Sequence, residues 1–529
     1  MAADCCIRFR ILQHYMSNLR NLLVLFASLT LYTLLCYFLH PYLGYMLDSD
    51  GIAYLTIARR VAEGDFLRSV NGLWSPLNSW LLSPCVYLGY SAWQTAKCLN
   101  IIFGAIVLCW VYMLLHRCRL PNNHIIPFLL SSAIGMSYFV YHQLFGDILQ
   151  LIFLLPYLLV LWPSKQPLSI SKTIVASLFI VFAFYAKAYS LVFYVAHFFI
   201  YLLLLYYQKQ LLFKEVCKHY CIGVGLAILC ILPWSFAMQN KYGEFNVMGV
   251  SGKMNMSWQI NSGKSFRSDI QLLIPPSYPD SPSFWEDPYP TQQDLSTPFS
   301  SFHHFLRWIA RILHTFLSYL VCMQEISFLS FGILGLAMYF FLVRTKDKLE
   351  NSPAVYLLLS IFILPVGYWL MHIETRYIWL CAFSLMAISG LLIQKLKQQL
   401  SYWMQMVLLY GIAFSFITFP VLQMEAQRYK NKDLFEMANQ WKKFGIKGSF
   451  TSNVKDAGRM WVIAYLAGNT FYTIEKEDFT EAELIQEMKR YHVKYFVFAS
   501  ENNILHPTST GSLQFVQKIS GMDIYTLIE

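Results

Sequence analysis

Apolar stretches of about twenty residues recur along most of this chain, and each is long enough for an α-helix to cross the hydrocarbon core of a bilayer. A soluble protein with one large core would not repeat that length so often. Of the 529 residues, 57% are hydrophobic and only 13% are charged, whereas a soluble domain carries about 25% charged residues. The sequence therefore predicts an all-α membrane domain that crosses the bilayer many times.

We expect about eleven membrane-spanning helices, with the N-terminus in the cytoplasm and the C-terminus outside. The first begins near Asn21, after Arg8, Arg10 and Arg20. It is longer than the core of a signal peptide and no small-residue cleavage site follows it, so we interpret it as an uncleaved anchor. The predicted spans are approximately 21–40, 96–115, 125–142, 148–162, 173–187, 189–206, 221–238, 326–343, 352–371, 377–394 and 402–421.

Charges in the short loops support this orientation. The loops assigned to the cytoplasm are all basic, whereas the other side receives the acidic segment 48–65 and the polar segment 240–301. The net charge of +10 is therefore an orientation signal, and we expect no nucleic-acid partner. The basic loops contain His116, Arg117 and Arg119; Lys165 and Lys172; Lys209 through Lys218; Arg344 and Lys346; and Lys395 and Lys397.

One apolar segment, Phe302–Cys322, is not counted as a span. It contains Arg307, Arg311 and three histidines, and a crossing here would move the basic loop at 344–348 to the outside. We expect this segment to form an amphipathic helix that lies in the membrane interface.

Charged residues become frequent after about residue 421, and the apolar runs shorten to strand length. We expect a helix near 480–491 and strands at 493–499 and 523–528, which together indicate a small extracytoplasmic α/β domain. The predicted division is a transmembrane domain at 1–421 with outer loops at 41–95 and 240–325, and the α/β domain at 422–529.

Cysteine and histidine spacing argues against a metal centre. The twelve cysteines include no CxxC pair, and most fall in predicted spans or on cytoplasmic loops, so neither a disulfide framework nor a zinc site is indicated. His303, His304 and His372 show no ligand spacing either.

Ionisable residues occur at three predicted outer helix ends. The first is Asp48-Ser49-Asp50-Gly51, where a partly desolvated carboxylate could act as a base toward a hydroxyl. The second is Asp147, at the start of the fourth span, where an acidic residue is costly unless it is paired or functional. For both places the alternative is helix capping, for which Asp is favoured.

The third place is His372-Ile373-Glu374-Thr375-Arg376-Tyr377, between spans nine and ten. Arg376 could bind a phosphate through its planar guanidinium, and Lys187 is placed similarly at the outer end of span five. The alternatives for these cations are a salt bridge, to Glu374 in the case of Arg376, or snorkelling toward water. Carboxylates and cations at one depth would suit a phosphate-bearing lipid with a sugar headgroup.

At these motifs the chain resembles the GT-C superfamily of membrane glycosyltransferases, particularly protein O-mannosyltransferases and lipid A aminoarabinose transferases. The resemblance runs over most of the chain, and the order, spacing and sidedness of the motifs agree with the family. The residues that carry it are Asp50-Gly51-x-x-Tyr54-x-x-x-Ala58, Gly64, Trp74-Ser75-Pro76-Leu77, Gly146-Asp147, Pro233-Trp234 with Asn240, Gly243 and Phe245, and Glu374-x-Arg376-Tyr377.

The resemblance implies a polyprenyl-phosphate-linked sugar as donor and inverting transfer to an acceptor hydroxyl. By position, Asp50 is the expected catalytic base and Asp48 the alternative, while Asp147 would support the acceptor or the loop. Lys187 and Arg376 are expected to hold the donor phosphate. The remaining motif residues, expected to bind substrate, are Tyr54, Glu374 and Tyr377.

One position departs from the family pattern. Many relatives carry a second acidic residue where this chain has Gly51. Asp48-Ser49-Asp50 could instead be a metal-binding DxD motif, as in the oligosaccharyltransferase relatives. We expect no metal and no other cofactor.

Two other functions remain open, a transporter or flippase for a lipid-linked sugar and a non-catalytic membrane scaffold in which the acidic residues are caps. A transport site tends toward the midplane, and no internal repeat is visible in the sequence, which weakens the first of these. The acceptor, whether lipid, glycan or protein, is not encoded in any motif. In a bacterium we expect the plasma (inner) membrane with an extracytoplasmic active face, and in a eukaryote a lumenal active face.

Overall fold

The computed structural model describes residues 2–142, 144, 146–164, 166–261, 271–290, 295–344, 352–476, 478–499 and 512–528, with side chains from Leu22 onward. Lys165 and Lys346, two lysines of the predicted basic loops, lie outside the described residues, as do the side chains of Arg8, Arg10 and Arg20.

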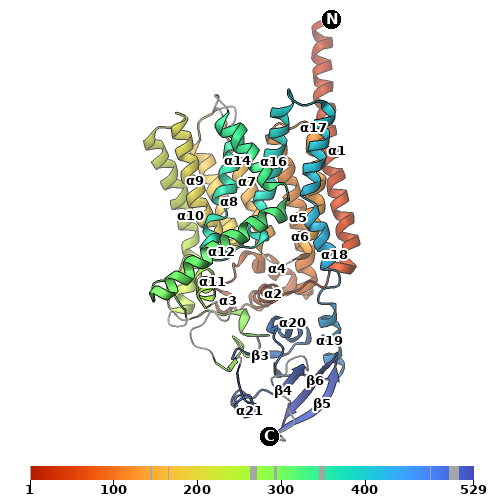
Figure 1. The fold of residues 1–529 in the computed structure, drawn as a ribbon, viewed down its shortest axis with the longest axis vertical. Coiled ribbons are helices and arrows are strands. Elements are labelled where there is room, and N and C mark those ends of the chain that lie inside the picture. The colour runs from red at the N-terminus through yellow and green to blue at the C-terminus, as the bar shows by residue number, and fades with distance from the viewer. Residues whose placement is uncertain are drawn as a thin grey trace.

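Long helices form a bundle, and shorter helices and a sheet cover one end of it (Figure 1). Every predicted span coincides with helical structure, because an apolar segment in lipid must satisfy its backbone groups internally. Nine helices of the described part are long and apolar enough to cross a membrane, and three shorter apolar helices accompany them. The bundle consists of α1 (Ala2–Leu43), α5 (Ala92–Arg117), α6 (Asn122–His142), α7 (Gly146–Val160), α8 (Ile170–Ala186), α9 (Tyr189–Tyr207), α10 (Phe213–Tyr242), α13 (Ser330–Met338) with η3 (Tyr339–Val343), α14 (Ser352–Ile363) with α15 (Val366–Trp369), α16 (Trp379–Leu396), and α17 (Tyr402–Ser415) with α18 (Thr418–Ala426).

The helix α12 (Phe302–Ile326) is the segment expected in the interface. It crosses the bundle obliquely instead of running parallel to its long neighbours (Figure 1). Its buried residues Thr315, Tyr319, Cys322 and Ile326 recur at helical spacing, so one face packs on the protein. Its length and hydropathy would also allow a crossing, so the number of spans stays a prediction.

Short helices from the two expected outer loops lie between the bundle and the C-terminal part (Figure 1). α2 (Ser49–Ala62) begins before the helix expected from Tyr54, because the Asp48 side chain caps it. The other elements of this layer are α3 (Phe66–Ser69), α4 (Leu77–Tyr87), α11 (Ser251–Ile260) and η1 (Phe284–Glu286).

Among the described residues, five strands of the C-terminal part and one strand from the second outer loop form a six-stranded sheet in the order β1-β3-β2-β4-β6-β5. The central strand β2 is parallel to β3 and β4, whereas β6 is antiparallel to both β4 and β5. The predicted C-terminal sheet is confirmed, since β4, β6 and α21 fall at the predicted strands and helix. The elements are α19 (Lys432–Lys443), β2 (Ser449–Ser452), α20 (Ala457–Ala467), β3 (Thr470–Ile474), α21 (Glu481–Arg490), β4 (Tyr495–Ala499), β5 (Leu513–Ile519) and β6 (Met522–Leu527).

Shared packing joins this sheet to the outer loops. β1 (Leu273–Ile274) belongs to the second outer loop and pairs antiparallel with β3. One hydrophobic cluster contains Ile52 and Leu55 of α2 together with Met460 and Ile463 of α20. The α/β part therefore holds α2 in place from one side. The domain boundary near residue 421 stays a prediction.

Two glycines provide a matched test of the bundle packing. A Cβ atom at Gly104 of α5 would lie 2.3 Å from the Tyr32 hydroxyl and 2.8 Å from Val140 Cγ1, whereas one at Gly225 of α10 would meet no atom within 4 Å. We expect Gly104→Ala to destabilise the protein by roughly 1–3 kcal/mol through overpacking. Gly225→Ala should be neutral or stabilising by up to about 1 kcal/mol, because alanine is the better helix former. Thermal unfolding in detergent measures both, and equal effects would contradict the packing of α5 against α1 and α6.

Candidate active site

A cavity of about 460 Å³ opens where the start of α2, the facing ends of α7 and α8, α11 and the segment before α16 meet. Its lining includes six of the eight residues expected to form the site, so the tertiary structure brings motifs from distant parts of the chain together. They are Asp50, Tyr54, Asp147, Lys187, Arg376 and Tyr377. The other two, Asp48 and Glu374, are not among the lining residues, but Glu374 forms an ion pair with the lining residue Arg376.

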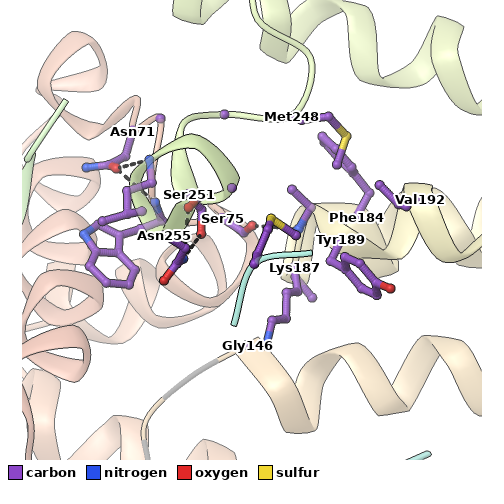
Figure 2. A pocket seen from close by; sticks show the side chains of 18 of the residues that line it. Asn71, Ser75, Gly146, Phe184, Lys187, Tyr189, Val192, Met248, Ser251 and Asn255 are labelled. Carbon is purple, nitrogen blue, oxygen red and sulfur yellow. Dashed lines mark hydrogen bonds between the residues drawn. The ribbon is translucent and has the colours of Figure 1, made fainter. Parts of the chain in front are cut away.

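The cavity has a polar side and an apolar side (Figure 2). Asn71, Ser75 and Asn255 lie on one side, and Phe184 and Val192 lie on the other. Such a cavity can hold a ligand that has a polar group attached to an apolar chain.

Asp48 is the N-cap of α2. Its Oδ1 accepts a hydrogen bond of 2.8 Å from the Gly51 backbone N–H. Burial and the neighbouring charge of Asp50 raise the pKa of the Asp48 carboxyl to about 7. The capping interpretation therefore holds for Asp48, and the carboxylate that remains available to the cavity is Asp50.

Asp50 lies in the first turn of α2, where its side chain faces the cavity. The indole Nε1 of Trp285 donates a hydrogen bond of 2.8 Å to Asp50 Oδ1, and the Ser49 hydroxyl lies 3.4 Å from the same atom. Burial raises the pKa of the Asp50 carboxyl, while the Arg376 charge and the Trp285 hydrogen bond oppose the rise. A partly buried carboxyl with a raised pKa, oriented by a hydrogen bond from Trp285, can act as a base toward an incoming hydroxyl.

Asp147, in the first turn of α7, and Lys187, directly after α8, form an ion pair. Their approach depends on Gly146, because a Cβ atom there would lie 2.1 Å from the Ala186 carbonyl oxygen. The start of α7 can thus contact the end of α8 closely. The Lys187 ammonium also lies 3.5 Å from the centre of the Tyr377 ring. The acidic residue at the start of α7 is therefore paired with a cation, Lys187.

Arg376 lies between two carboxylates. Its Nε is 2.8 Å from Glu374 Oε2, and its Nη1 is 3.9 Å from Asp147 Oδ2. The salt bridge to Glu374, which was the alternative to phosphate binding for Arg376, is therefore present. Burial alone would raise the pKa of Glu374, but the hydrogen bond from His372 and the charge of Arg376 hold it well below its usual range.

Three aromatic residues at the site were not predicted. Trp285 contacts Asp50 from the second outer loop, and Tyr368 stacks on Tyr377 with ring centres 4.8 Å apart and on Tyr189 at 3.7 Å. The sequence distance between Asp50 and Trp285 carries no periodic signal. In an aromatic-rich chain, tyrosines near helix ends also look like ordinary membrane-interface residues.

The described residues give little support to a metal site. Among them, no group of three or more His, Cys, Asp or Glu side chains could hold an ion. Asp48 and Asp50 each use Oδ1 to accept a hydrogen bond, from Gly51 and Trp285 respectively.

Comparison with known proteins identifies the fold. No family model matches the sequence, and no curated protein matches it. ArnT from Cupriavidus metallidurans bound to undecaprenyl phosphate superposes with a TM-score of 0.57 and 11% identity over 96% of this chain and 98% of that chain. Its apo state gives 0.58 and 11% over 97% and 98%.

An oligosaccharyltransferase from Archaeoglobus fulgidus, in complex with Zn and sulfate, gives a TM-score of 0.54 and 13% identity over 90% of this chain and 68% of that chain. The chain therefore shares its overall fold with ArnT and with this oligosaccharyltransferase. The resemblance seen in the sequence is thus confirmed at the level of architecture, and the chain is an integral multi-pass membrane protein.

Replacing Asp48 by Asn tests the titration of the cap. The pKa of Asp48 rises from about 4 in an unfolded chain to about 7 in the fold. The folded state then holds an extra proton between these values, so stability should fall as pH rises from about 4 to about 7. Asparagine keeps the cap but cannot titrate. We expect the Asp48→Asn variant to show a weaker fall in unfolding temperature over this range.

Asp456→Asn is the matched control, because Asp456 caps α20 through Gly458 but is exposed. This variant should keep the wild-type pH dependence. A wild-type slope in Asp48→Asn would show that the Asp48 pKa is not raised.

Proposed function

We propose that this protein is a glycosyltransferase that moves a sugar from a polyprenyl-phosphate donor to an acceptor hydroxyl, with inversion and with Asp50 as base. The observation that carries the proposal is that Asp50, Lys187 and Arg376 line one cavity. A base and two cations are the groups that this reaction needs. The GT-C architecture and the undecaprenyl phosphate bound to ArnT support the same donor class.

The donor phosphate would bind to Lys187 and Arg376. Both cations are paired with carboxylates in the described structure, but each also lines the cavity. The guanidinium can donate two parallel hydrogen bonds to a phosphate, and the ammonium adds a compact charge. Phe184 and Val192 supply an apolar wall for the first isoprene units.

The transfer would be a single displacement. The Asp50 carboxylate takes the proton from the acceptor hydroxyl while the acceptor oxygen forms a bond to the sugar's anomeric carbon. The bond between that carbon and the phosphate oxygen breaks, and the bonding electrons leave with the polyprenyl phosphate. Lys187 and Arg376 stabilise the negative charge that develops on the phosphate. One displacement inverts the anomeric centre.

The remaining residues have supporting roles in this proposal. Asp147 neutralises Lys187 and keeps it directed at the cavity, and Glu374 does the same for Arg376. Tyr54 and Tyr377 line the cavity beside these groups and can contact the sugar. Asp48 remains the structural cap of α2.

The site would lie on the outer face of the membrane, periplasmic in a bacterium and lumenal in a eukaryote, and the loop charges support this orientation. The bilayer is one partner, and a lipid, glycan or protein supplies the acceptor hydroxyl. A transporter is less well supported, because the ionisable groups lie at helix ends on the side that carries the C-terminal sheet (Figure 1).

Asp50→Asn tests the base. The amide keeps the size of the side chain but cannot take the proton, so transfer should fall by about 10²-fold or more while donor binding stays near wild type. Turnover is measured on purified protein in detergent with polyprenyl-phosphate monosaccharides and a mixed acceptor extract, with and without chelator. We expect no effect of chelator.

Asp65→Asn is the control for this experiment, because Asp65 caps α3 on the same outer loop. It should transfer like wild type. A fully active Asp50→Asn variant would remove Asp50 as the base, and chelator-sensitive turnover would make the Asp48–Asp50 pair a metal ligand. No turnover by wild type with any donor would favour the transporter.

Arg376→Lys tests phosphate recognition. Lysine keeps the charge but loses the planar fork, so the affinity for undecaprenyl phosphate should fall by roughly tenfold, since a hydrogen bond to a charged group contributes about 1.5–3 kcal/mol. Tryptophan fluorescence or calorimetric titration measures the change. Arg68→Lys, at an exposed arginine paired with Asp65, is the control and should bind like wild type. Unchanged affinity in Arg376→Lys would place the phosphate elsewhere.

A further inference from the structure

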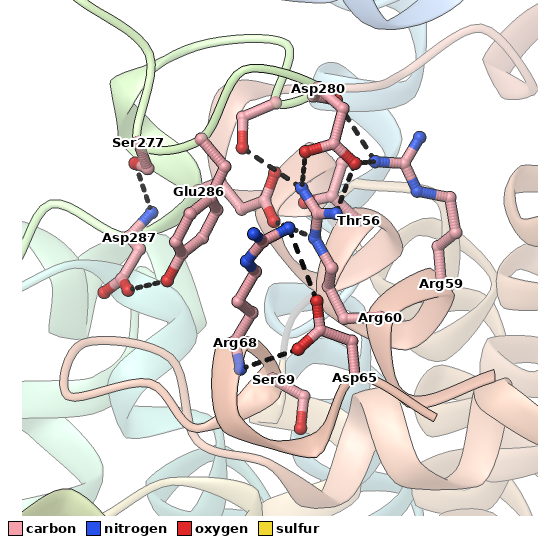
Figure 3. Close-up of polar contacts among 12 residues, drawn as sticks. Thr56, Arg59, Arg60, Asp65, Arg68, Ser69, Ser277, Asp280, Glu286 and Asp287 are labelled. Atoms are coloured by element: carbon pink, nitrogen blue, oxygen red, sulfur yellow. Dashed lines mark hydrogen bonds and ion pairs between the residues drawn. The ribbon is translucent and has the colours of Figure 1, made fainter. Parts of the chain in front are cut away.

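A short segment of the second outer loop, η1 with its flanking residues 280–287, is bound to α2 by ion pairs. The Arg60 Nε lies 3.0 Å from Glu286 Oε1, and both side chains are about 2% exposed. Arg60 also pairs with Asp280, as Figure 3 shows. On the same side, Asn71 Nδ2 donates a hydrogen bond of 2.7 Å to the Glu286 carbonyl. Buried pairing of this kind holds η1 in one position relative to α2.

The C-terminal part contacts the other side of η1. The Phe471 N–H of β3 donates a hydrogen bond of 2.9 Å to the Pro282 carbonyl. The Trp461 ring of α20 stacks on the Trp285 ring, with centres 5.5 Å apart and planes at 20°. Trp461 is itself held by a hydrogen bond of 3.1 Å from its Nε1 to Thr473 Oγ1 of β3. The indole of Trp285 therefore has a fixed neighbour in the α/β part.

The N–H group of the same indole reaches the cavity residue Asp50. Trp285 Nε1 donates to Asp50 Oδ1 at 2.8 Å, and the Trp285 carbonyl accepts a hydrogen bond of 3.1 Å from Trp74 Nε1. A continuous series of contacts thus runs from β3 through Trp461 and Trp285 to the carboxylate.

We propose that the C-terminal part positions Asp50 through Trp461 and Trp285, which are positioning residues of the proposed transfer reaction. The inference rests on the proposed role of Asp50 as base. Trp461 sets the plane of the Trp285 ring, and the indole N–H then holds the carboxylate in its ionised form and in one rotamer. The α/β part thereby contributes to the reaction without touching the substrate.

The direction of the effect follows from the charges around Asp50. An N–H donor stabilises a carboxylate, so the Trp285 hydrogen bond lowers the Asp50 pKa, against burial, which raises it. From η1, Glu286 faces α2 but is neutralised by Arg60. Other titratable or charged groups interact electrostatically with Asp50 directly or through its neighbour Asp48. They are Asp48 itself, Tyr54, Lys97, Glu374, Arg376 and Tyr377.

Trp285→Phe separates this role from a general structural one. Phenylalanine keeps an aromatic ring against Trp461 but has no N–H, so the Asp50 pKa should rise. A base works when deprotonated, so the acid limb of the kcat/KM profile should move to higher pH, by on the order of one unit. At neutral pH the variant should be several-fold slower, and at alkaline pH it should recover the wild-type rate. The assay uses the purified full chain with polyprenyl-phosphate monosaccharides and the mixed acceptor extract.

Trp461 variants test the link to the C-terminal part. Trp461→Leu removes the stacked ring and should shift the acid limb in the same direction, while Trp461→Phe keeps a ring and should restore most of the wild-type profile. Trp441→Phe is the matched control, because Trp441 is a buried tryptophan of α19 in the same part, where its ring packs against Phe450 of β2. It should show the wild-type profile.

The outcomes are distinct. A wild-type profile in Trp285→Phe, or a loss that is equal at every pH, overturns the inference and leaves the proposed transferase activity standing. An equal shift in Trp441→Phe also overturns it, since the effect would then be one of domain stability. Absence of turnover in the wild type with every donor overturns the proposed function and, with it, this inference.

Discussion

At one end of the helix bundle, two cationic side chains and two carboxylates lie together, partly removed from solvent. Lys187 pairs with Asp147, and Arg376 lies between Asp147 and Glu374. A charge buried alone would cost several kcal/mol, so each group can be held here only with a partner beside it. This requirement fixes how the start of α7, the end of α8 and the segment before α16 meet, and the cavity exists because they meet in this way.

Charge compensation of this kind suits a site that binds a phosphate. In the proposed reaction the cations would already be oriented when a phosphate arrives, so less conformational entropy would be lost on binding. The same surroundings leave Asp50 under opposed influences, because burial favours its neutral form while Arg376 and Trp285 favour the ionised form. A carboxyl balanced between the two states is well suited to accept a proton.

The outer layer completes the site from a different direction. Asp50 lies on α2. This helix forms an ion pair with the second outer loop, between Arg60 and Glu286, and it packs against α20. The α/β part is thus connected to the Asp50 carboxylate by a series of direct contacts, so it contributes to the geometry of the candidate site. The α/β part lies beyond the end of the helix bundle (Figure 1), but it shares a hydrophobic cluster and a sheet with the outer loops.

Sequence patterns predicted much of this site. Asp50, Asp147, Lys187 and Arg376 were recognised because an ionisable residue at a membrane helix end is conspicuous against apolar surroundings. Asp48 and Asp50 could not be separated in this way, since both are acceptable caps, and only the hydrogen bond from Gly51 shows which one caps α2. Trp285 was missed because nothing local marks an indole that reaches across to another loop.

The length and spacing of the apolar runs, together with the loop charges, were enough to predict the membrane class and most of the helices, because backbone hydrogen bonding in lipid leaves so few alternatives. They also predicted the α/β character of the C-terminal part. Which residues meet was decided only by the tertiary structure. Ion pairing, stacking and close glycine contacts such as Gly146 on Ala186 depend on distances between segments that are remote in the chain, and no periodicity within a segment encodes them.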